Sequence, residues 1–263
     1  MFALERQKRI LQRLQENGAV WVSRLAQELD VTEETVRRDL EKLERQEALM
    51  RTHGGAVPVD ATGYELSLEK RKHMNVGVKQ QLALEAVKLI LPGDTVFLDA
   101  STTTFYMAKA LRGLKNVTVV TNSLRAVSEL AGQDGLKVIC VGGMVSNNQS
   151  VVGPVAEREI RENYFADKMF FSSKGVVAST GILEGSETEC GIKQQMLANS
   201  RHRYYLCDKT KFDRVGFVKC ADLSSIDAIL TDAAPDDKWL SWAGETGVSI
   251  LSIAKQENTK SDK

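Results

Sequence analysis

The fold is decided by residues 32–40, TEETVRRDL, which predict the start of a helix with one apolar and one polar side. Thr32 is a suitable N-cap, and Val36, Leu40 and Leu43 repeat at the spacing of a buried helical stripe. A rotation of about 100° per residue turns the charged side chains away from the core. The side chains on that opposite side are Glu34, Arg38, Glu41 and Arg45, with Arg37 beside them.

Two helices are expected before this one. The first covers residues 4–17 and stops at Gly18. The second is a short helix with Ser23 as its candidate N-cap and an apolar repeat at Val22, Leu25, Ala26 and Leu29. After the third helix, residues 49–57 predict a two-stranded hairpin in which Gly54 and Gly55 form the tight turn. Helix, turn, helix and hairpin together predict a winged helix-turn-helix.

The residue types of the third helix point to two possible partners. The hydroxyls of Thr32 and Thr35 lie at its N-terminus, where they can meet a phosphate, and the arginines can reach DNA backbone or base edges. However, residues 1–57 contain ten Arg and Lys and ten Asp and Glu, so the segment is neutral. A solvated three-helix domain that binds another protein would have the same charge count. Both alternatives stay open on patterning alone.

A resemblance to a known family favours DNA over a protein as the partner of the third helix. Residues 32–40, with RTHGGAV at 51–57, resemble the signature of the DeoR (deoxyribose-operon repressor) family of bacterial transcription regulators. The resemblance implies a winged helix-turn-helix that binds operator DNA. For the wing histidine, stabilisation of the turn is an equal alternative. The contacts that the resemblance implies are Thr35, Arg37 and Arg38 in the helix and Arg51 and His53 in the wing.

The pattern weakens after the hairpin, so a linker is expected over residues 58–78. Its charged run at 69–73 is interpreted as a solvated helix surface, with phosphate contacts as the alternative. A helix over 80–91 then opens the second domain. The predicted organisation is a DNA-binding domain at 1–57, the linker, an α/β domain at 79–254 and a tail at 255–263.

Short β-branched runs alternate with helical stretches after Gly93, which predicts an α/β fold with a parallel sheet. Ligands bind such sheets beyond the carboxyl ends of the strands. The first strand ends in DASTTT at 99–104, whose hydroxyls and free backbone N–H groups suit an anion; helix capping is the alternative for these residues. TNS at 121–123 and DKTKF at 208–212 follow later strands. Glycine-rich dinucleotide and P-loop motifs do not occur.

These strand ends resemble the C-terminal sensor domain of the DeoR family, which is related to ribose-phosphate isomerase and senses phosphorylated sugars or related metabolites. The resemblance implies an effector whose binding releases the operator. Surface roles remain the alternative for the two lysines at 193 and 211. The implied phosphate contacts are Ser101, Thr102 and Thr103, and the implied sugar contacts are Asp99, Asn122, Glu187, Lys193, Asp208 and Lys211.

The sequence departs from the isomerase pattern at residues 171–175, FSSKG. Isomerase-type relatives carry an acidic cluster there, and sugar isomerisation needs a base to remove a proton next to a carbonyl. A lysine in this position is protonated unless strongly desolvated. Catalysis is therefore not expected, and Lys174 is predicted to give an additional anion contact.

Composition limits the remaining classes. The 263 residues carry 35 Lys and Arg against 35 Asp and Glu, which excludes a histone-like basic binder and an acidic carrier. No run of about 18 apolar residues and no secretory leader occurs, so a cytoplasmic protein without a membrane partner is expected. The four cysteines lack metal or disulfide spacing and are expected to be buried free thiols. We expect no metal and no cofactor.

The sequence thus predicts a transcription regulator, expected to be a repressor of a carbohydrate operon, that binds operator DNA and a phosphorylated sugar. Operators for helix-turn-helix proteins mirror protein symmetry, so a homodimer or homotetramer is expected. Two alternatives remain: a sugar-phosphate isomerase-like enzyme with an N-terminal interaction module, and a protein-binding adaptor.

Overall fold

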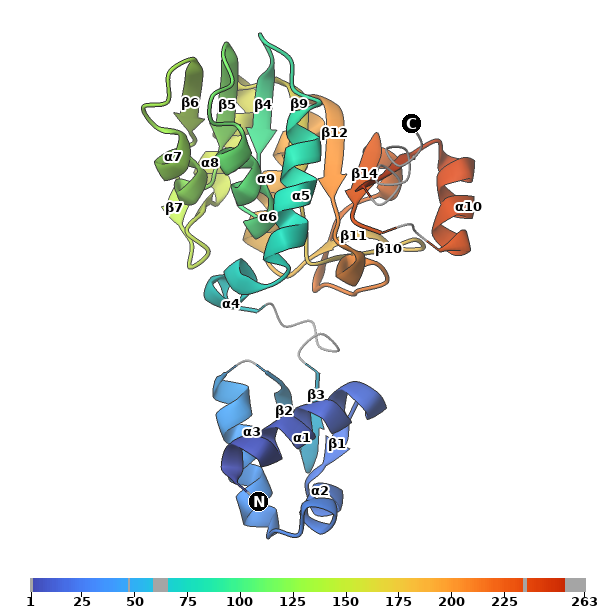
Figure 1. Ribbon diagram of the computed structural model, residues 1–263. Coiled ribbons are helices and arrows are strands. Elements are labelled where there is room, and N and C mark those ends of the chain that lie inside the picture. Colours follow the sequence, from blue (N-terminus) through green and yellow to red (C-terminus); the bar gives the residue numbers. More distant parts are fainter. Residues whose placement is uncertain (1, 47, 59–65, 234–235, 254–263) are drawn as a thin grey trace, which may run out of the picture. The chain divides into compact units, whose positions relative to one another are not determined.

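The computed structural model describes residues 2–46, 48–58, 66–233 and 236–253, and it divides into two compact units, Met1–Ser67 and Leu68–Lys263 (Figure 1). The division lies inside the range expected as a linker. Helix α4 (Leu68–His73) and the first residues of α5 (Val76–Val87) lie in the second half of that range, and both helices belong to the second unit. The rest of the expected linker, and the expected tail, lie largely outside the described residues.

The first unit is a winged helix-turn-helix, as predicted. Ile10, Leu25 and Leu40 come from its three helices and meet in one apolar core. The buried carboxylate of Asp39 accepts a hydrogen bond from Gln7 at 2.9 Å and so joins the third helix to the first. The strands pair antiparallel in the order β1-β3-β2. The elements are α1 (Ala3–Asn17), β1 (Val20–Trp21), α2 (Val22–Leu29), α3 (Glu33–Arg45), β2 (Met50–Thr52) and β3 (Gly55–Val57).

Two local predictions in this unit are wrong. Ser23 does not cap α2, because the Val22 N–H donates to the carbonyl of Gly54 and the strand passes directly into the helix. The hairpin turn is formed by His53 and Gly54, whereas Gly55 already belongs to β3. A Cβ on Gly55 would lie 2.0 Å from the Val20 carbonyl oxygen, so this glycine is needed for the close approach of β1.

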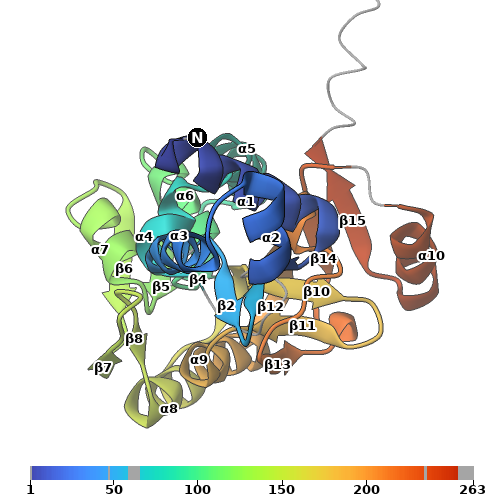
Figure 2. The same cartoon turned by 90° about the horizontal axis from the view of Figure 1, so that it is seen from below.

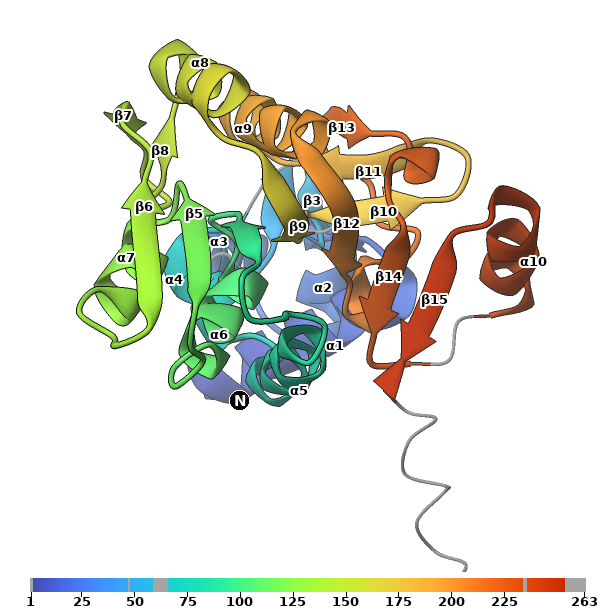
Figure 3. The ribbon, with the colours of Figure 1, turned by 90° about the horizontal axis from the view of Figure 1, so that it is seen from above.

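The second unit is built on a seven-stranded parallel sheet in the order β15-β14-β12-β9-β4-β5-β6, which confirms the predicted α/β class. Helices α5, α6 and α7 cover one face and α8 and α9 the other (Figure 3). The strands are β4 (Thr95–Leu98), β5 (Val117–Thr121), β6 (Leu136–Cys140), β9 (Ala166–Phe171), β12 (Ser200–Leu206), β14 (Ala228–Thr231) and β15 (Ser249–Ser252). The helices are α6 (Thr102–Ala110), α7 (Leu124–Leu130), α8 (Pro154–Asn163), α9 (Glu187–Ala198) and α10 (Asp237–Thr246).

Several short strands were not predicted, because runs of two to four residues carry no clear periodicity. β7 (Met144–Val145) and β8 (Val151–Val152) form a hairpin, and β10 (Gly175–Val177), β11 (Gly181–Glu184) and β13 (Val218–Ala221) form a small antiparallel sheet on the α9 side (Figures 2 and 3). Helix α5 also begins and ends about four residues before the predicted range. No helix in the described part of the chain has the length and apolarity to cross a membrane.

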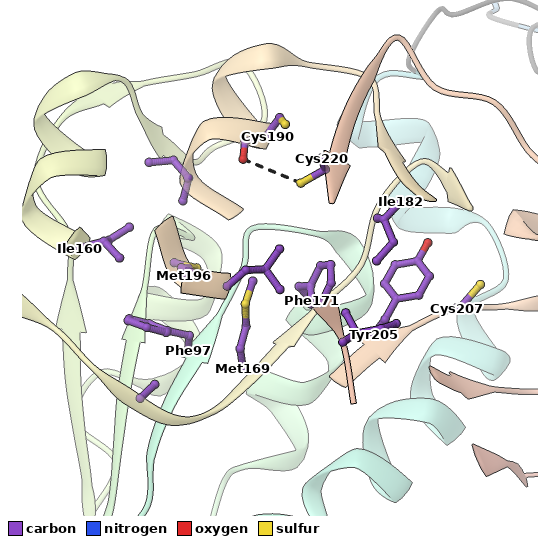
Figure 4. Close-up of a cluster of buried hydrophobic side chains, with 14 of the residues drawn as sticks. Phe97, Ile160, Met169, Phe171, Ile182, Cys190, Met196, Tyr205, Cys207 and Cys220 are labelled. Atoms are coloured by element: carbon purple, nitrogen blue, oxygen red, sulfur yellow. Dashed lines mark hydrogen bonds between the residues drawn. The ribbon is translucent and has the colours of Figure 1, made fainter. Parts of the chain in front are cut away.

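Apolar side chains fill the space between the sheet and helices α8 and α9 (Figure 4). Phe97, Met169 and Tyr205 are fully buried in this core. The prediction of buried free cysteines holds for three of the four, since Cys190, Cys207 and Cys220 lie in the same core. It is wrong for Cys140, which is exposed at the end of the edge strand β6.

Candidate functional site

The N-terminus of α3 presents two hydroxyl groups to solvent. Thr32 caps the helix, because its Oγ1 accepts a hydrogen bond from the Thr35 backbone N–H at 3.2 Å. The hydroxyls of Thr32 and Thr35 lie 2.9 Å apart. A helix N-terminus carries partial positive charge and unpaired N–H groups, so this end of α3 suits a phosphate.

The exposed arginines of α3 are each paired with a glutamate one turn earlier. The distances between nitrogen and oxygen are 2.7 Å for Arg37–Glu33, 3.2 Å for Arg38–Glu34 and 2.5 Å for Arg45–Glu41. Residues 33–45 contain five acidic and four basic side chains, a net charge of −1. Exposed pairs of this kind contribute only about 0.3–0.5 kcal/mol, so the arginines can exchange glutamate for phosphate.

The wing lies beside the C-terminal half of α3. Arg51 in β2 pairs with Glu44 at 3.3 Å, and its backbone N–H donates to the same carboxylate at 2.9 Å. His53 is exposed in the turn. Of the two predicted wing side chains, Arg51 thus lies on β2, which Glu44 of α3 contacts, and His53 lies in the turn that follows.

In the second unit, Asp99 is the centre of the polar groups at the carboxyl ends of the strands. It is 1% exposed and accepts hydrogen bonds from Thr104 Oγ1 at 2.7 Å and from the Ser172 N–H at 3.3 Å. Lys193 on α9 lies 3.3 Å from Asp99 and 2.6 Å from Glu184. Burial alone would lower the pKa of Lys193, but these two carboxylates outweigh it and raise the pKa well above its usual value.

The hydroxyls after β4 have divided roles. Ser101 caps α6 by accepting from the Thr104 N–H at 3.2 Å, and Thr104 binds Asp99, so these two satisfy the local structure. Thr103 Oγ1 is buried and has no hydrogen-bond partner among the described residues. Asn122 donates to the Val151 carbonyl at 3.1 Å, yet its Oδ1 is also buried without a partner in the described part. Two buried oxygens in the segments that follow β4 and β5 therefore lack a hydrogen-bond partner among the described residues.

A second group gathers around the end of β12. Lys211 Nζ donates to Ser172 Oγ at 2.5 Å. Asp208 accepts from the Thr210 N–H at 3.1 Å and from Asn75 Nδ2 at 3.3 Å. Burial opposes ionisation of Asp208, but Lys211 and the Thr210 hydrogen bonds outweigh it and lower its pKa. Charged and neutral polar groups from three separate segments meet here.

Lys79 was missed by the sequence analysis and belongs to the same group. It is 4% exposed, and its Nζ donates to the backbone carbonyl of Arg71 at 2.6 Å. Burial and then the charge of Lys211 lower the pKa of Lys79 to about 8, against the opposing effect of Asp208. The available signal was its position three residues before Leu82, on the apolar side of α5.

The other residues predicted to bind the effector differ in how deeply they are buried. Thr102 and Lys174 are buried, and the Lys174 N–H donates to the Leu183 carbonyl at 3.1 Å. Glu187 is exposed in the first turn of α9. The buried acids of that region are instead Glu184 and Glu189. The structure thus joins Asp99 to Lys193 and, through Ser172, to Lys211, and it leaves Glu187 on the surface.

The FSSKG segment ends β9 inside this site. Ser172 Oγ donates to the Leu206 carbonyl at 2.6 Å, and Ser173 shares a 2.7 Å hydrogen bond with the Tyr205 hydroxyl. Both serines therefore form hydrogen bonds to residues of the neighbouring strand β12. Neither supplies a carboxylate that could act as a base.

Together, an exposed helix-turn-helix surface and a parallel sheet with polar groups at its carboxyl edge define a regulator with a DNA-binding unit and a sensor unit. Residues 6–62 match the model of the DeoR-like helix-turn-helix domain, and residues 74–233 match the DeoR C terminal sensor domain. The chain belongs to the DeoR family of transcriptional regulators.

Similar proteins span almost the whole chain. The uncharacterized HTH-type transcriptional regulator YulB of Bacillus subtilis is 37% identical over 90% of this chain and 91% of that protein. The L-fucose operon activator of Haemophilus influenzae is 34% identical over 88% and 93%. The HTH-type transcriptional repressor GlcR of Bacillus subtilis is 29% identical over 99% and 100%.

Among solved structures, a D-ribose-5-phosphate isomerase in complex with phospho-erythronic acid matches 52% of this chain and 54% of that chain, with 15% identity and a TM-score of 0.40.

Proposed function

We propose that the first unit binds operator DNA through the N-terminus of α3 and the wing. The support is the group formed by Thr32, Thr35, Arg37 and Arg38 at the surface of α3, whose side chains bond only within their own helix as far as the described residues show. Arg51 and His53 extend this surface into the wing. Hydroxyls and a helix N-terminus bind phosphates, and guanidinium groups bind phosphates or guanine edges in the major groove.

The second unit is proposed to bind a phosphorylated sugar at the carboxyl edge of its sheet. The observation that supports this is a pair of buried oxygens without a partner in the described part of the chain, Thr103 Oγ1 and Asn122 Oδ1, which follow strands β4 and β5. Lys211, after β12, contributes an ammonium group bonded to Ser172. The N-terminus of α6 adds backbone N–H groups for the phosphate. Carboxylates such as Asp208 suit sugar hydroxyls, which donate hydrogen bonds to them.

The proposed target is a carbohydrate operon, and the proposed sign of control is repression. One relative is named as an L-fucose operon activator and another as a transcriptional repressor. Both signs therefore occur within this architecture. For this chain we propose that the effector releases the operator, which requires different effector affinities for the DNA-bound and free forms.

A regulator without enzymatic activity fits the site better than an isomerase. Asp99 and Glu184 are both paired with Lys193, and the end of β9 supplies two hydrogen-bonded serines and a lysine. Isomerisation needs a base placed beside the proton next to the sugar carbonyl, and residues 171–175 lack the acidic cluster that isomerase-type relatives carry there. Incubation with pentose and hexose phosphates, followed by product analysis, is expected to show no turnover; efficient conversion would favour the enzyme.

The proposed binding to operator DNA also leads to a proposal for the oligomeric state and the cellular location of the protein. A symmetric operator is matched by a symmetric protein, so we propose a homodimer or homotetramer in the cytoplasm. Light scattering after gel filtration distinguishes these assemblies from a monomer.

A titration of labelled DNA from the region upstream of the gene tests the proposal. The full-length protein is expected to bind this duplex with an affinity that falls steeply with salt, because phosphate contacts release counterions. A panel of sugar monophosphates is then added at constant ionic strength, and one of them is expected to release the DNA. A DNA affinity that does not change with salt concentration, or no DNA binding at all, would favour the protein-binding adaptor.

A further inference from the structure

Helix α4 is the first element of the second unit and the point where the chain arrives from the DNA-binding unit. Three hydrogen bonds hold α4 and the start of α5, and two of them reach residues far along the chain. Lys79 Nζ donates to the Arg71 carbonyl at 2.6 Å, the Arg71 guanidinium donates to Asn148 Oδ1 at 2.8 Å, and Asn75 donates to Asp208 at 3.3 Å. We call this set of contacts the α4 clasp.

Two members of the clasp belong to the effector site itself. Asp208 lies beside Lys211, and Lys79 is close enough to Lys211 for their charges to repel. The Arg71 carbonyl lies in the last turn of α4, where carbonyls lack a partner within the helix, so Lys79 acts as a C-terminal cap for α4. The same ammonium group thus faces the site and holds the helix.

The clasp also reaches the turn between β7 and β8. Asn148 lies in this turn, and its backbone N–H donates to Ser146 Oγ at 3.1 Å. Ser146 and Ser150 both donate to the buried carboxylate of Glu189 on α9. Arg71 therefore holds α4 to a turn that is itself fixed to the body of the second unit.

We propose that an anionic ligand held by Lys79 and Lys211 tightens the α4 clasp, so that α4 transmits the occupancy of the effector site. This inference rests on the effector site proposed above. The ammonium group has three N–H donors, and the Arg71 carbonyl uses one of them. An anion offsets the repulsion from Lys211 and keeps Lys79 charged, which strengthens its charge-assisted bond to the carbonyl. The ligand thereby favours the arrangement in which α4 is firmly docked.

Amide hydrogen exchange in residues 68–75 of the full-length protein tests this directly. Inorganic phosphate serves as the probe and sodium chloride of equal ionic strength as its control, while calorimetry measures phosphate binding separately. Phosphate is expected to slow exchange in this segment by about threefold or more, because local opening is rarer in a docked helix. Asn148→Ala is expected to bind phosphate with unchanged affinity but to lose most of the slowing.

The neighbouring variant Asn147→Ala is the matched control, since Asn147 is exposed and its side chain makes no hydrogen bond in the described part of the chain. It is expected to behave like the unmodified protein. Phosphate binding without slower exchange in α4, or full slowing in Asn148→Ala, would overturn the clasp and leave the effector site intact. Absence of phosphate binding would overturn the anionic effector and the clasp together.

Discussion

The ion pairs of α3 and those of the sheet edge are built in opposite ways. In α3 each pair is exposed and joins residues four apart on one helix. At the sheet edge, Lys193 is 4% exposed and contacts acids from two other segments, Asp99 and Glu184. The first arrangement depends on one helix alone, and the second depends on the whole sensor fold.

This difference separates side chains that are free to change partners from side chains that hold a shape. An exposed pair contributes well under about 1 kcal/mol, so DNA phosphates can replace the glutamates of α3. Removing one partner of a buried pair costs about 3–5 kcal/mol, because a charge is left uncompensated. Lys79 lies between these cases, since it is buried but contacts a carbonyl rather than a carboxylate.

The largest expected effect is on DNA binding. The double variant Arg37→Ala and Arg38→Ala is expected to lower operator affinity about 100-fold, because two guanidinium contacts are lost. Fluorescence anisotropy with a labelled upstream duplex measures this. Arg45→Ala is the control, since it removes the same kind of pair at the C-terminal end of the helix. A double variant within about threefold of the unmodified protein would contradict the assignment of α3.

The next effect concerns the buried lysine. Lys79→Met is expected to weaken binding of the releasing sugar phosphate about 30-fold, since a charge-assisted hydrogen bond is lost. It is also expected to raise the midpoint of thermal unfolding at pH 7, because burying the ammonium group opposes folding. Calorimetry and a melting curve give the two readouts. Lys88→Met on the exposed side of the same helix is expected to change neither.

The pH dependence of effector affinity should report the protonation of Lys79. Burial and Lys211 lower the pKa of Lys79 to about 8, so the folded protein loses this charge above that pH. Effector affinity is expected to fall about tenfold between pH 7 and 9, and the fall should be absent in Lys79→Met. Because the unfolded chain keeps the proton up to about pH 10.4, this group makes stability rise with pH above about 8. Equal affinity at both pH values would exclude Lys79 as the anion contact.

The smallest effect should come from the glutamates of α3. Glu33→Gln frees Arg37 and removes one negative charge from the helix, so non-specific DNA affinity at low salt is expected to rise about threefold. The matched variant is Glu16→Gln, which removes an exposed acid paired with Arg13 on α1. An equal gain in both variants would show that only net charge matters.

Local patterns predicted the parts of the structure that depend on near neighbours. Thr32 at the start of α3 and the apolar stripe of that helix follow from spacing within one segment, and the strand ends of the sheet edge follow from the α/β alternation. The burial of Lys79 and the exposure of Glu187 could not be predicted in this way. Lys79 is near the charges of Asp208 and Lys211, more than a hundred residues further along the chain, and no local pattern records such proximity.

The two units have separate apolar cores, and the division between them falls at Ser67 and Leu68. Each core is closed by residues of its own segment, so neither unit relies on the other to bury its side chains. Such a chain lends itself to recombination. A fusion that keeps all residues from Leu68 onward would join this sensor unit to a different DNA-binding domain. Effector specificity and operator specificity can therefore evolve independently.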